Sequence, residues 1–170
     1  EEADEDLLRD MSDEATKILS EYGFNKYEVS NYSKPNFESK HNLDCWNQKD
    51  YIGFGSGAHS YTNVKGYSNI DSLEEYIQNY KNEQESNNFV FHERQNLQSV
   101  MKEYMMLGLR KINGVKIIDF KNKFGQNPIF VFKTELEKLL NEDLIEIDEN
   151  SIKLSKNGID FANLVWAEFV

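Results

Sequence analysis

The chain has 170 residues, of which 39% are hydrophobic and 13% aromatic, so it is apolar enough to bury a core and is not a disordered chain. No apolar run approaches the roughly 20 residues that span a bilayer. The single cysteine excludes an intrachain disulfide and any zinc or iron–sulfur site held by this chain's thiolates alone.

The formal net charge of −11 is unevenly distributed along the chain. Residues 1–87 hold 8 Lys or Arg against 18 Asp or Glu, and residues 88–170 hold 11 against 12. Such an acidic first half repels nucleic acid and anionic membranes, which argues against both as partners. The chain opens on acidic residues rather than a signal peptide, and it is poor in cysteine. We therefore expect a cytoplasmic protein with no integral membrane segment.

The first elements resemble one step of a larger α/β layer. Apolar residues recur at helical spacing over residues 6–22, and Gly23 follows as a left-handed cap. Residues 27–32 are typical of a short strand, whereas residues 33–50 are polar and aperiodic, which predicts a loop. One αβ step cannot make a sheet, so the chain looks like a fragment. The open strand edge predicts a mobile segment or a homodimer.

A capping-box pattern at Ser72 and Glu75 begins the next predicted helix. Its apolar face would consist of Leu73, Tyr76, Ile77 and Tyr80. We place a boundary in the polar stretch that follows. The predicted units are residues 1–70, a connecting helix and linker at 71–87, and a C-terminal domain at 88–170.

The C-terminal domain has the element order of a winged helix: three helices, a hairpin and a last helix. The third helix would bury Ile129, Phe132, Leu136, Leu139 and Leu140, and the last helix carries Phe161, Leu164, Val165 and Phe169. The third helix carries more acidic than basic residues and would repel phosphate, so a packing module is favoured over DNA binding. Glu103 and Arg110, two turns apart, predict a structural ion pair.

Two segments could carry chemistry. Glycines 53, 55 and 57 could let a backbone approach a ligand, although tight turning alone is the better explanation of the glycines. Ala58 and His59 follow them, and the histidine favours a lined pocket slightly. His41-Asn42-Leu43-Asp44-Cys45-Trp46 combines two iron-ligand side chains, one helical turn apart, with a flat apolar ring. The plainer alternative is a loop histidine beside a buried cysteine and tryptophan.

The order of these motifs resembles one family. Four motifs follow one another as in the oxygen-independent coproporphyrinogen III oxidases. They are Tyr27-Glu28-Val29-Ser30-Asn31-Tyr32, His41-Asn42-x-x-Cys45-Trp46, Tyr51-x-Gly53-x-Gly55-x-Gly57-Ala58-His59-Ser60-Tyr61 and Glu103-Tyr104-Met105-Met106-Leu107-Gly108-Leu109-Arg110. These are radical S-adenosylmethionine proteins. The closer likeness is to their haem-chaperone (HemW-like) branch, whose HNxxYW motif is matched except that Cys45 replaces the tyrosine.

The resemblance implies an α+β fold: the last αβ step of a partial (β/α) barrel joined to a winged-helix-like domain with a hairpin. It implies a parent protein with a [4Fe–4S] cluster, S-adenosylmethionine and an electron donor, the cluster motif being absent from this chain. Haem-binding candidates are His41, Asn42 and Trp46, with Cys45 as a further one. Gly55, Gly57, Ala58 and His59 would line the S-adenosylmethionine pocket, and this chain would hold no catalytic or cluster-binding residue.

Three functions remain open at this point. The leading one is haem binding and transfer to apo-haemoproteins. The second is the oxidative decarboxylation of coproporphyrinogen III in porphyrin biosynthesis, by a radical mechanism that this chain alone could not drive. The third is a non-catalytic interaction module.

Overall fold

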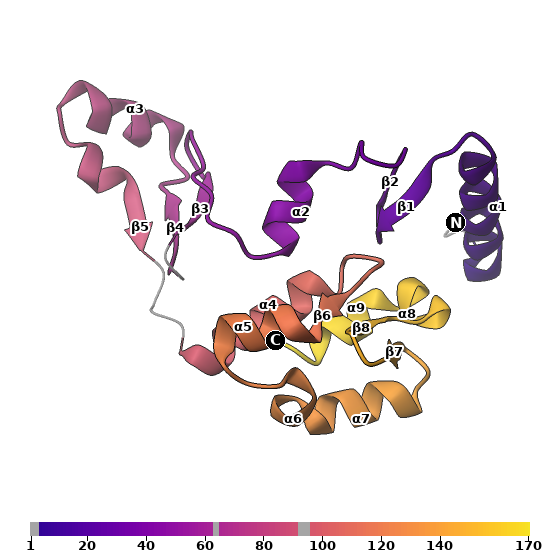
Figure 1. Cartoon of the computed structure of the whole chain (residues 1–170). Coiled ribbons are helices and arrows are strands. Elements are labelled where there is room, and N and C mark those ends of the chain that lie inside the picture. Colours follow the sequence, from indigo (N-terminus) through magenta and orange to yellow (C-terminus); the bar gives the residue numbers. More distant parts are fainter. Residues whose placement is uncertain (1–3, 63–64, 92–95) are drawn as a thin grey trace.

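The computed structural model describes residues 4–62, 65–91 and 96–170, and its fold is α+β, as predicted. The chain forms three small antiparallel sheets with strand orders β1-β2, β3-β4-β5 and β6-β8-β7, which lie in different parts of the molecule next to helices (Figure 1). No helix in these ranges combines the length and the apolar character that a bilayer crossing needs.

The predicted first helix is confirmed as α1 (Glu5–Glu21), and Gly23 ends it at a φ of 80°. The predicted strand at 27–32 is wrong. It is a hairpin of β1 (Asn25–Glu28) and β2 (Asn31–Ser33), so no parallel αβ step forms among these residues. The turn is stabilised by the Glu28 carboxylate, which accepts from the Ser30 N–H at 3.2 Å and from the Asn31 amide.

The free edge expected at this strand is also not found on β1. The Val29 N–H donates to the Arg110 carbonyl at 2.9 Å, and the Ile112 N–H donates to the Tyr27 carbonyl at 3.2 Å. These bonds attach the hairpin to the loop that follows α4 (Leu97–Gly108). The N-terminal hairpin and the C-terminal unit are thereby joined through backbone.

A second correction concerns the predicted loop at 33–50, which contains the helix α2 (Lys40–Trp46). Ser39 begins this helix, because its hydroxyl accepts from the Asn42 N–H at 3.3 Å. The local capping signal was present, but the helix is short and polar. Hydrophobic periodicity therefore could not reveal it.

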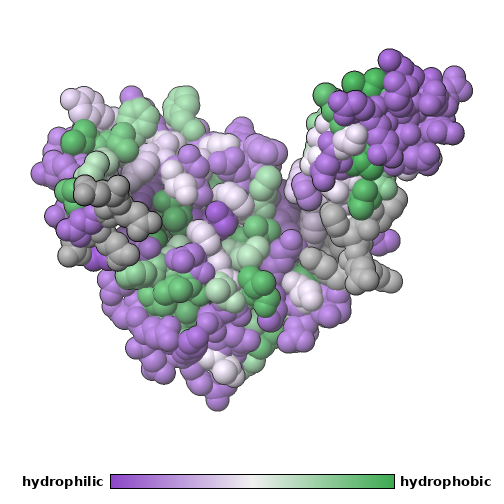
Figure 2. Space-filling model, turned by 180° about the vertical axis from the view of Figure 1, so that it is seen from behind, coloured by the Kyte–Doolittle hydropathy of each residue, from purple (hydrophilic) through white to green (hydrophobic). Residues whose placement is uncertain are grey.

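The middle sheet consists of β3 (His59–Thr62), β4 (Lys65–Asn69) and β5 (Phe89–Phe91), which comes after the 3₁₀ turn η1 (Glu85–Asn88). The predicted helix is confirmed as α3 (Leu73–Lys81), with Ser72 as its cap. Its expected apolar face is largely exposed. The helix is attached instead through buried Asn79, whose amide donates to Asn88 Oδ1 at 2.8 Å. In Figure 2 this region projects as a separate lobe.

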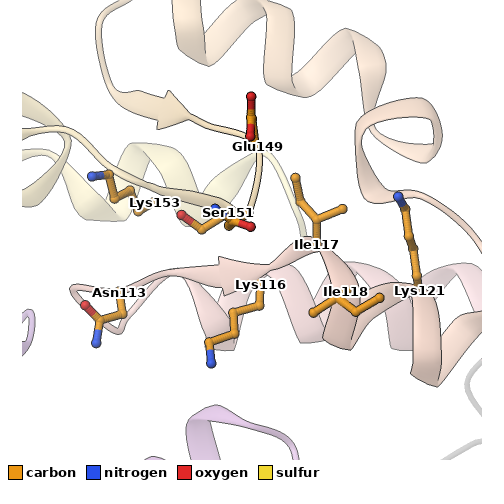
Figure 3. A pocket seen from close by; sticks show the side chains of 9 residues that line it. Asn113, Lys116, Ile117, Ile118, Lys121, Glu149, Ser151 and Lys153 are labelled. Atoms are coloured by element: carbon orange, nitrogen blue, oxygen red, sulfur yellow. The ribbon is translucent and has the colours of Figure 1, made fainter.

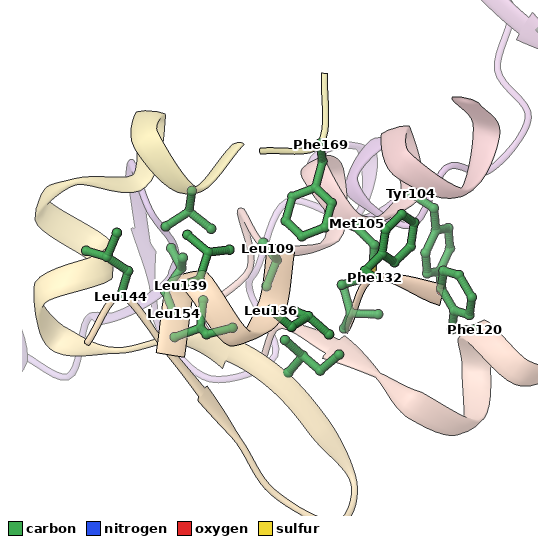
Figure 4. Packing of buried hydrophobic residues seen from close by; sticks show 14 of the residues in the cluster. Tyr104, Met105, Leu109, Phe120, Phe132, Leu136, Leu139, Leu144, Leu154 and Phe169 are labelled. Atoms are coloured by element: carbon green, nitrogen blue, oxygen red, sulfur yellow. The ribbon is translucent and has the colours of Figure 1, made fainter. Parts of the chain in front are cut away.

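The C-terminal unit holds the main core. Its elements are α4, β6 (Val115–Lys116), α5 (Ile117–Phe124), α6 (Pro128–Val131), α7 (Lys133–Asn141), β7 (Ile145–Ile147), β8 (Ser151–Leu154), α8 (Lys156–Asp160) and α9 (Ala162–Ala167). Phe120, Phe132 and Phe169 are fully buried, and their rings meet edge to face (Figure 4). The predicted hairpin is confirmed, and β6 adds a third strand that the sequence did not reveal.

Two predicted helices of this unit are each divided. The third breaks at Phe132 (φ −113°, ψ 36°) and the last at Phe161 (φ −111°, ψ 31°). Leu140, which was predicted to face inward, is exposed, and so are Phe161 and Leu164 of the last helix.

Candidate functional site

Helix α2 brings His41 and Cys45 to one side, as their spacing predicted. The Sγ of Cys45 lies 3.8 Å from Nε2 of His41. His41 is exposed and Cys45 is half-buried. Burial raises the pKa of the Cys45 thiol, and the Asp44 carboxylate raises it further. The thiol is therefore neutral at neutral pH, which leaves the imidazole as the stronger candidate for a metal ligand on this helix.

Trp46 is the last residue of α2, and its side chain projects about 100° around the helix axis from that of Cys45. Its ring contacts Arg110, whose guanidinium carbon lies 4.6 Å from the ring centroid. The same guanidinium lies 4.1 Å from the ring centroid of Trp166 on α9. Two indole rings thus hold one cation, a favourable arrangement for arginine. Sequence spacing had predicted Glu103 as the partner of Arg110, and that prediction is wrong.

Glu103 instead accepts a hydrogen bond from Gln48 Nε2 at 2.7 Å. Gln48 is 5% exposed and has a left-handed backbone (φ 52°), which is costly for a residue with a side chain. Lys123 donates to Gln48 Oε1 at 2.9 Å, and burial lowers the pKa of its ammonium, an effect opposed by Asp50 and Glu103. The residue after α2, Asn47, accepts from Lys111. Residues 46, 47 and 48 are therefore all fixed by the C-terminal unit.

A cavity of about 160 Å³ lies where α2 meets α4. Its lining includes Cys45, Trp46, Tyr51, Tyr61 and Glu103. The backbones of two lining residues, Tyr51 and Tyr61, form a pair of hydrogen bonds with each other, with N–H···O distances of 2.8 and 3.0 Å. Burial, reinforced by the nearby acidic residues, raises the pKa of Tyr61 to about 12, so its hydroxyl stays protonated.

The glycine segment forms a turn in front of β3. Gly53 must be glycine, because a Cβ there would overlap the His59 carbonyl oxygen. Gly55 and Gly57 have φ values of 102° and 69°, and space beside Gly55 is open. The Asn69 amide donates to the Gly55 carbonyl at 2.7 Å and so fixes the turn. Both explanations of these glycines, tight turning and an approachable backbone, are compatible with this geometry.

The structure thus brings together some of the predicted site residues. Cys45 and Trp46 share the cavity with Tyr51 and Tyr61, whereas Gly55, Gly57, Ala58 and His59 do not line it. A larger cavity of about 670 Å³ on the C-terminal unit includes Lys116, Lys121 and Lys153 in its lining, but none of the predicted site residues (Figure 3). Within the described ranges, no group of three or more His, Cys, Asp or Glu side chains could hold a metal ion.

Sequence reasoning missed the residues that hold α2. Arg110 and Lys111 were visible as cations beside the end of a helix, but their partners are distant in sequence. The two tryptophans were the available signal, because an arginine in a core-forming segment needs an aromatic or acidic partner.

Comparison with known proteins agrees with the resemblance. A profile described as the HemN C-terminal domain matches residues 96–161. A protein named heme chaperone HemW from Lactococcus lactis is 34% identical over 98% of this chain and 43% of the relative. Its namesake in Bacillus subtilis is 31% identical over 89% of this chain and 40% of the relative.

The fold also matches a solved structure. The radical SAM enzyme coproporphyrinogen III oxidase (HemN) from Escherichia coli superposes with a TM-score of 0.71 at 15% identity, over 94% of this chain and 40% of that one. The chain therefore spans less than half the length of the relatives that it matches.

Proposed function

Because the chain belongs to the HemN/HemW family of radical SAM proteins, we propose that it is part of a cytoplasmic haem chaperone and that His41 is its ligand to haem iron. The exposed imidazole on α2 is the observation that carries this proposal. Haem is the cargo, and an apo-haemoprotein is the proposed acceptor. The haem-chaperone names of two relatives, which match 98% and 89% of this chain, support this choice.

The residues around His41 fit a planar iron complex. Asn42 follows His41 in the first turn of α2, and Cys45 lies one turn away with a thiol that burial keeps protonated. Such a thiol is a weak iron ligand, so Cys45 would border the macrocycle rather than coordinate it. Trp46 supplies an indole ring at the end of the same helix, and a macrocycle that extends from His41 past Cys45 would reach it.

The family implies a [4Fe–4S] cluster and S-adenosylmethionine in the whole protein. This chain has one cysteine, so it does not fit a cluster site, and cysteines outside the chain would hold the cluster. The open space beside Gly55 and the positive φ values of Gly55 and Gly57 fit a backbone that a nucleotide approaches. We propose that these residues, with Ala58 and His59, line the S-adenosylmethionine pocket.

We also propose the domain division. Residues 1–70 would form the end of the partial barrel, residues 71–87 a connection, and residues 88–170 the winged-helix-like domain. The attachment of β1 to residues 110–112 supports a fixed position of the last unit relative to the first.

Titration of haem into the full chain tests the function. We expect a shifted Soret band for the wild-type chain and loss of that shift in His41→Ala. Lys40→Ala is the matched control, because Lys40 is an exposed neighbour in the same helix. Cys45→Ser should retain the band. An unchanged spectrum and affinity in His41→Ala would remove His41 from the site.

The decarboxylase alternative has weaker support. It rests on a fold likeness at 15% identity and on a HemN C-terminal domain profile that matches residues 96–161, and neither shows chemistry. An anaerobic assay of the whole protein for conversion of coproporphyrinogen III to protoporphyrinogen IX would separate the two functions.

A further inference from the structure

The contact of Arg110 with two indole rings leaves its guanidinium without an acceptor among the described residues. A guanidinium carries five N–H donors, and no described residue accepts a hydrogen bond from this group or forms an ion pair with it. The Nε of Arg110 is buried and has no partner. The indole Nε1 atoms of Trp46 and Trp166 are buried in the same way.

Three buried donors in one stack are unusual for a folded protein. A buried polar group without a partner is destabilising, and native structures contain few of them. Here the three donors come from three elements, at the ends of α2 and α4 and within α9, and all belong to the same contact. Because every group is a donor, the missing partner must be an acceptor.

Charge narrows the class of acceptor. The stack contains one permanent positive charge, and Lys111 adjoins it in sequence. No carboxylate of the described residues pairs with Arg110, although the chain as a whole carries 30 acidic residues. Guanidinium groups bind carboxylates through two parallel hydrogen bonds. Arg110 is half-buried, so part of its donor edge remains accessible.

We propose that Trp46, Arg110 and Trp166 form a carboxylate-binding site that takes a propionate group of a tetrapyrrole. The source of the carboxylate rests on the proposed function. Trp46 links the two sites, because it ends the helix that carries His41 and its ring contacts Arg110. A macrocycle on the free part of the Trp46 ring would bring its side chains to the edge of that ring, beside the guanidinium.

The test uses the full chain and porphyrins without iron, so that ligation by His41 plays no part. Protoporphyrin IX, its dimethyl ester and free propionate are titrated, and quenching of tryptophan fluorescence or porphyrin anisotropy reports binding. The ester differs from the acid only in its lost carboxylates. We expect the acid to bind the wild-type chain about tenfold more tightly than the ester, as for loss of a charge-assisted hydrogen bond.

That preference for the acid should vanish in Arg110→Gln and persist in Lys116→Gln, which removes the same charge from an exposed position. Trp166→Phe keeps an aromatic ring on α9 but removes one hydrogen-bond donor, so it should reduce the preference for the acid. This variant replaces Arg110→Gln as the test if Arg110→Gln does not fold. Equal affinity for acid and ester, a preference that survives in Arg110→Gln, or no porphyrin binding would each overturn the proposal. Free propionate that binds as tightly as the porphyrin would overturn the tetrapyrrole as its source.

The proposed function fails separately. If haem binding is indifferent to His41→Ala while the acid-over-ester preference still depends on Arg110, the iron ligand is wrong and the carboxylate site stands. If His41 is required for haem binding but the preference ignores Arg110, the reverse holds.

Discussion

Lys111 offers a test of how the C-terminal unit holds α2. Burial lowers the pKa of its ammonium from 10.5 to about 8, an effect that Asp119 opposes and Lys116 reinforces. Because this pKa is lower in the folded chain, the unfolded chain binds more protons between pH 8 and pH 10.5. The free energy of unfolding contributed by Lys111 therefore rises as the pH rises through that window.

The size of the effect follows from the same values. One pH unit across the window corresponds to about 1.4 kcal/mol, so charged Lys111 costs the fold at most about 3.5 kcal/mol at neutral pH. The side chain keeps some exposure, which reduces the change expected between about pH 7.5 and about pH 9.5 to about 1–2 kcal/mol. Lys111→Met removes the charge but keeps the unbranched stem, so this rise should be absent from the variant.

Urea unfolding at these pH values, with the wild-type chain, Lys111→Met and exposed Lys121→Met, measures the effect. The raised pKa values of Cys45, Tyr51 and Tyr61 act in the opposite direction at high pH, but all three proteins share them. The difference between wild type and variant isolates Lys111. Parallel pH profiles for wild type and Lys111→Met would refute a buried ammonium, and Lys121→Met should follow the wild type, because Lys121 is exposed and does not shift the pKa of Lys111.

Two further substitutions test the packing of the C-terminal unit by urea unfolding. In Gly158→Ala the new Cβ would overlap the Leu144 carbonyl oxygen, so we expect the free energy of unfolding to fall by at least about 2 kcal/mol. Gly125→Ala has open space but a φ of 70°, and it should cost only about 1–2 kcal/mol. Equal losses in the two variants would contradict the overlap. Phe120→Ala empties the middle of the aromatic cluster and should cost about 3–5 kcal/mol, against less than about 0.5 kcal/mol for exposed Ile118→Ala.

The sequence predicted best where local signals and burial agree. In α5, Ile117, Phe120 and Phe124 recur at helical spacing, Gly125 follows the helix with a φ of 70°, and Phe120 is fully buried. In the β7–β8 hairpin, alternation and a polar turn point to the same two strands. Each of these elements carries its own stop signal, so few tertiary contacts are needed to place it.

The prediction of a single strand at residues 27–32 was wrong for the opposite reason. Alternation over residues 27–32 is the same for one strand as for two strands joined by a tight turn, and no glycine or proline marks the turn. The turn depends on Glu28, a buried carboxylate that binds the residues after it.

Likewise, the periodicity of α1 identifies an apolar face but not what covers it. Leu7, Leu8 and Met11 are more than half exposed, and hydrophobic side chains gather on this side of the molecule in Figure 2.

The sequence predicted the residue types of the candidate site but not the contacts that hold α2 in place. His41 and Cys45 share a side of α2 because their spacing is one helical turn, which the sequence contains. The partners of Trp46, Asn47 and Gln48 lie on α4, on α5 and in the loop between them, and one-dimensional patterns do not record such pairings. Glu103 was predicted as the partner of Arg110 because a spacing of seven residues would place both on one helix face, but α4 ends at Gly108 and Arg110 lies in the loop after it.

The support of α2 determines where His41 points. The helix has seven residues, none of them buried, and so short a helix is not stable in isolation. Its position depends on three successive residues that contact the C-terminal unit: Trp46 on Arg110, Asn47 on Lys111 and Gln48 on Glu103 and Lys123. Unfolding of that unit therefore removes the frame of the His41 site as well as its own core. Haem affinity should accordingly fall together with stability in Phe120→Ala, although that side chain lies in the aromatic core of the C-terminal unit rather than on α2.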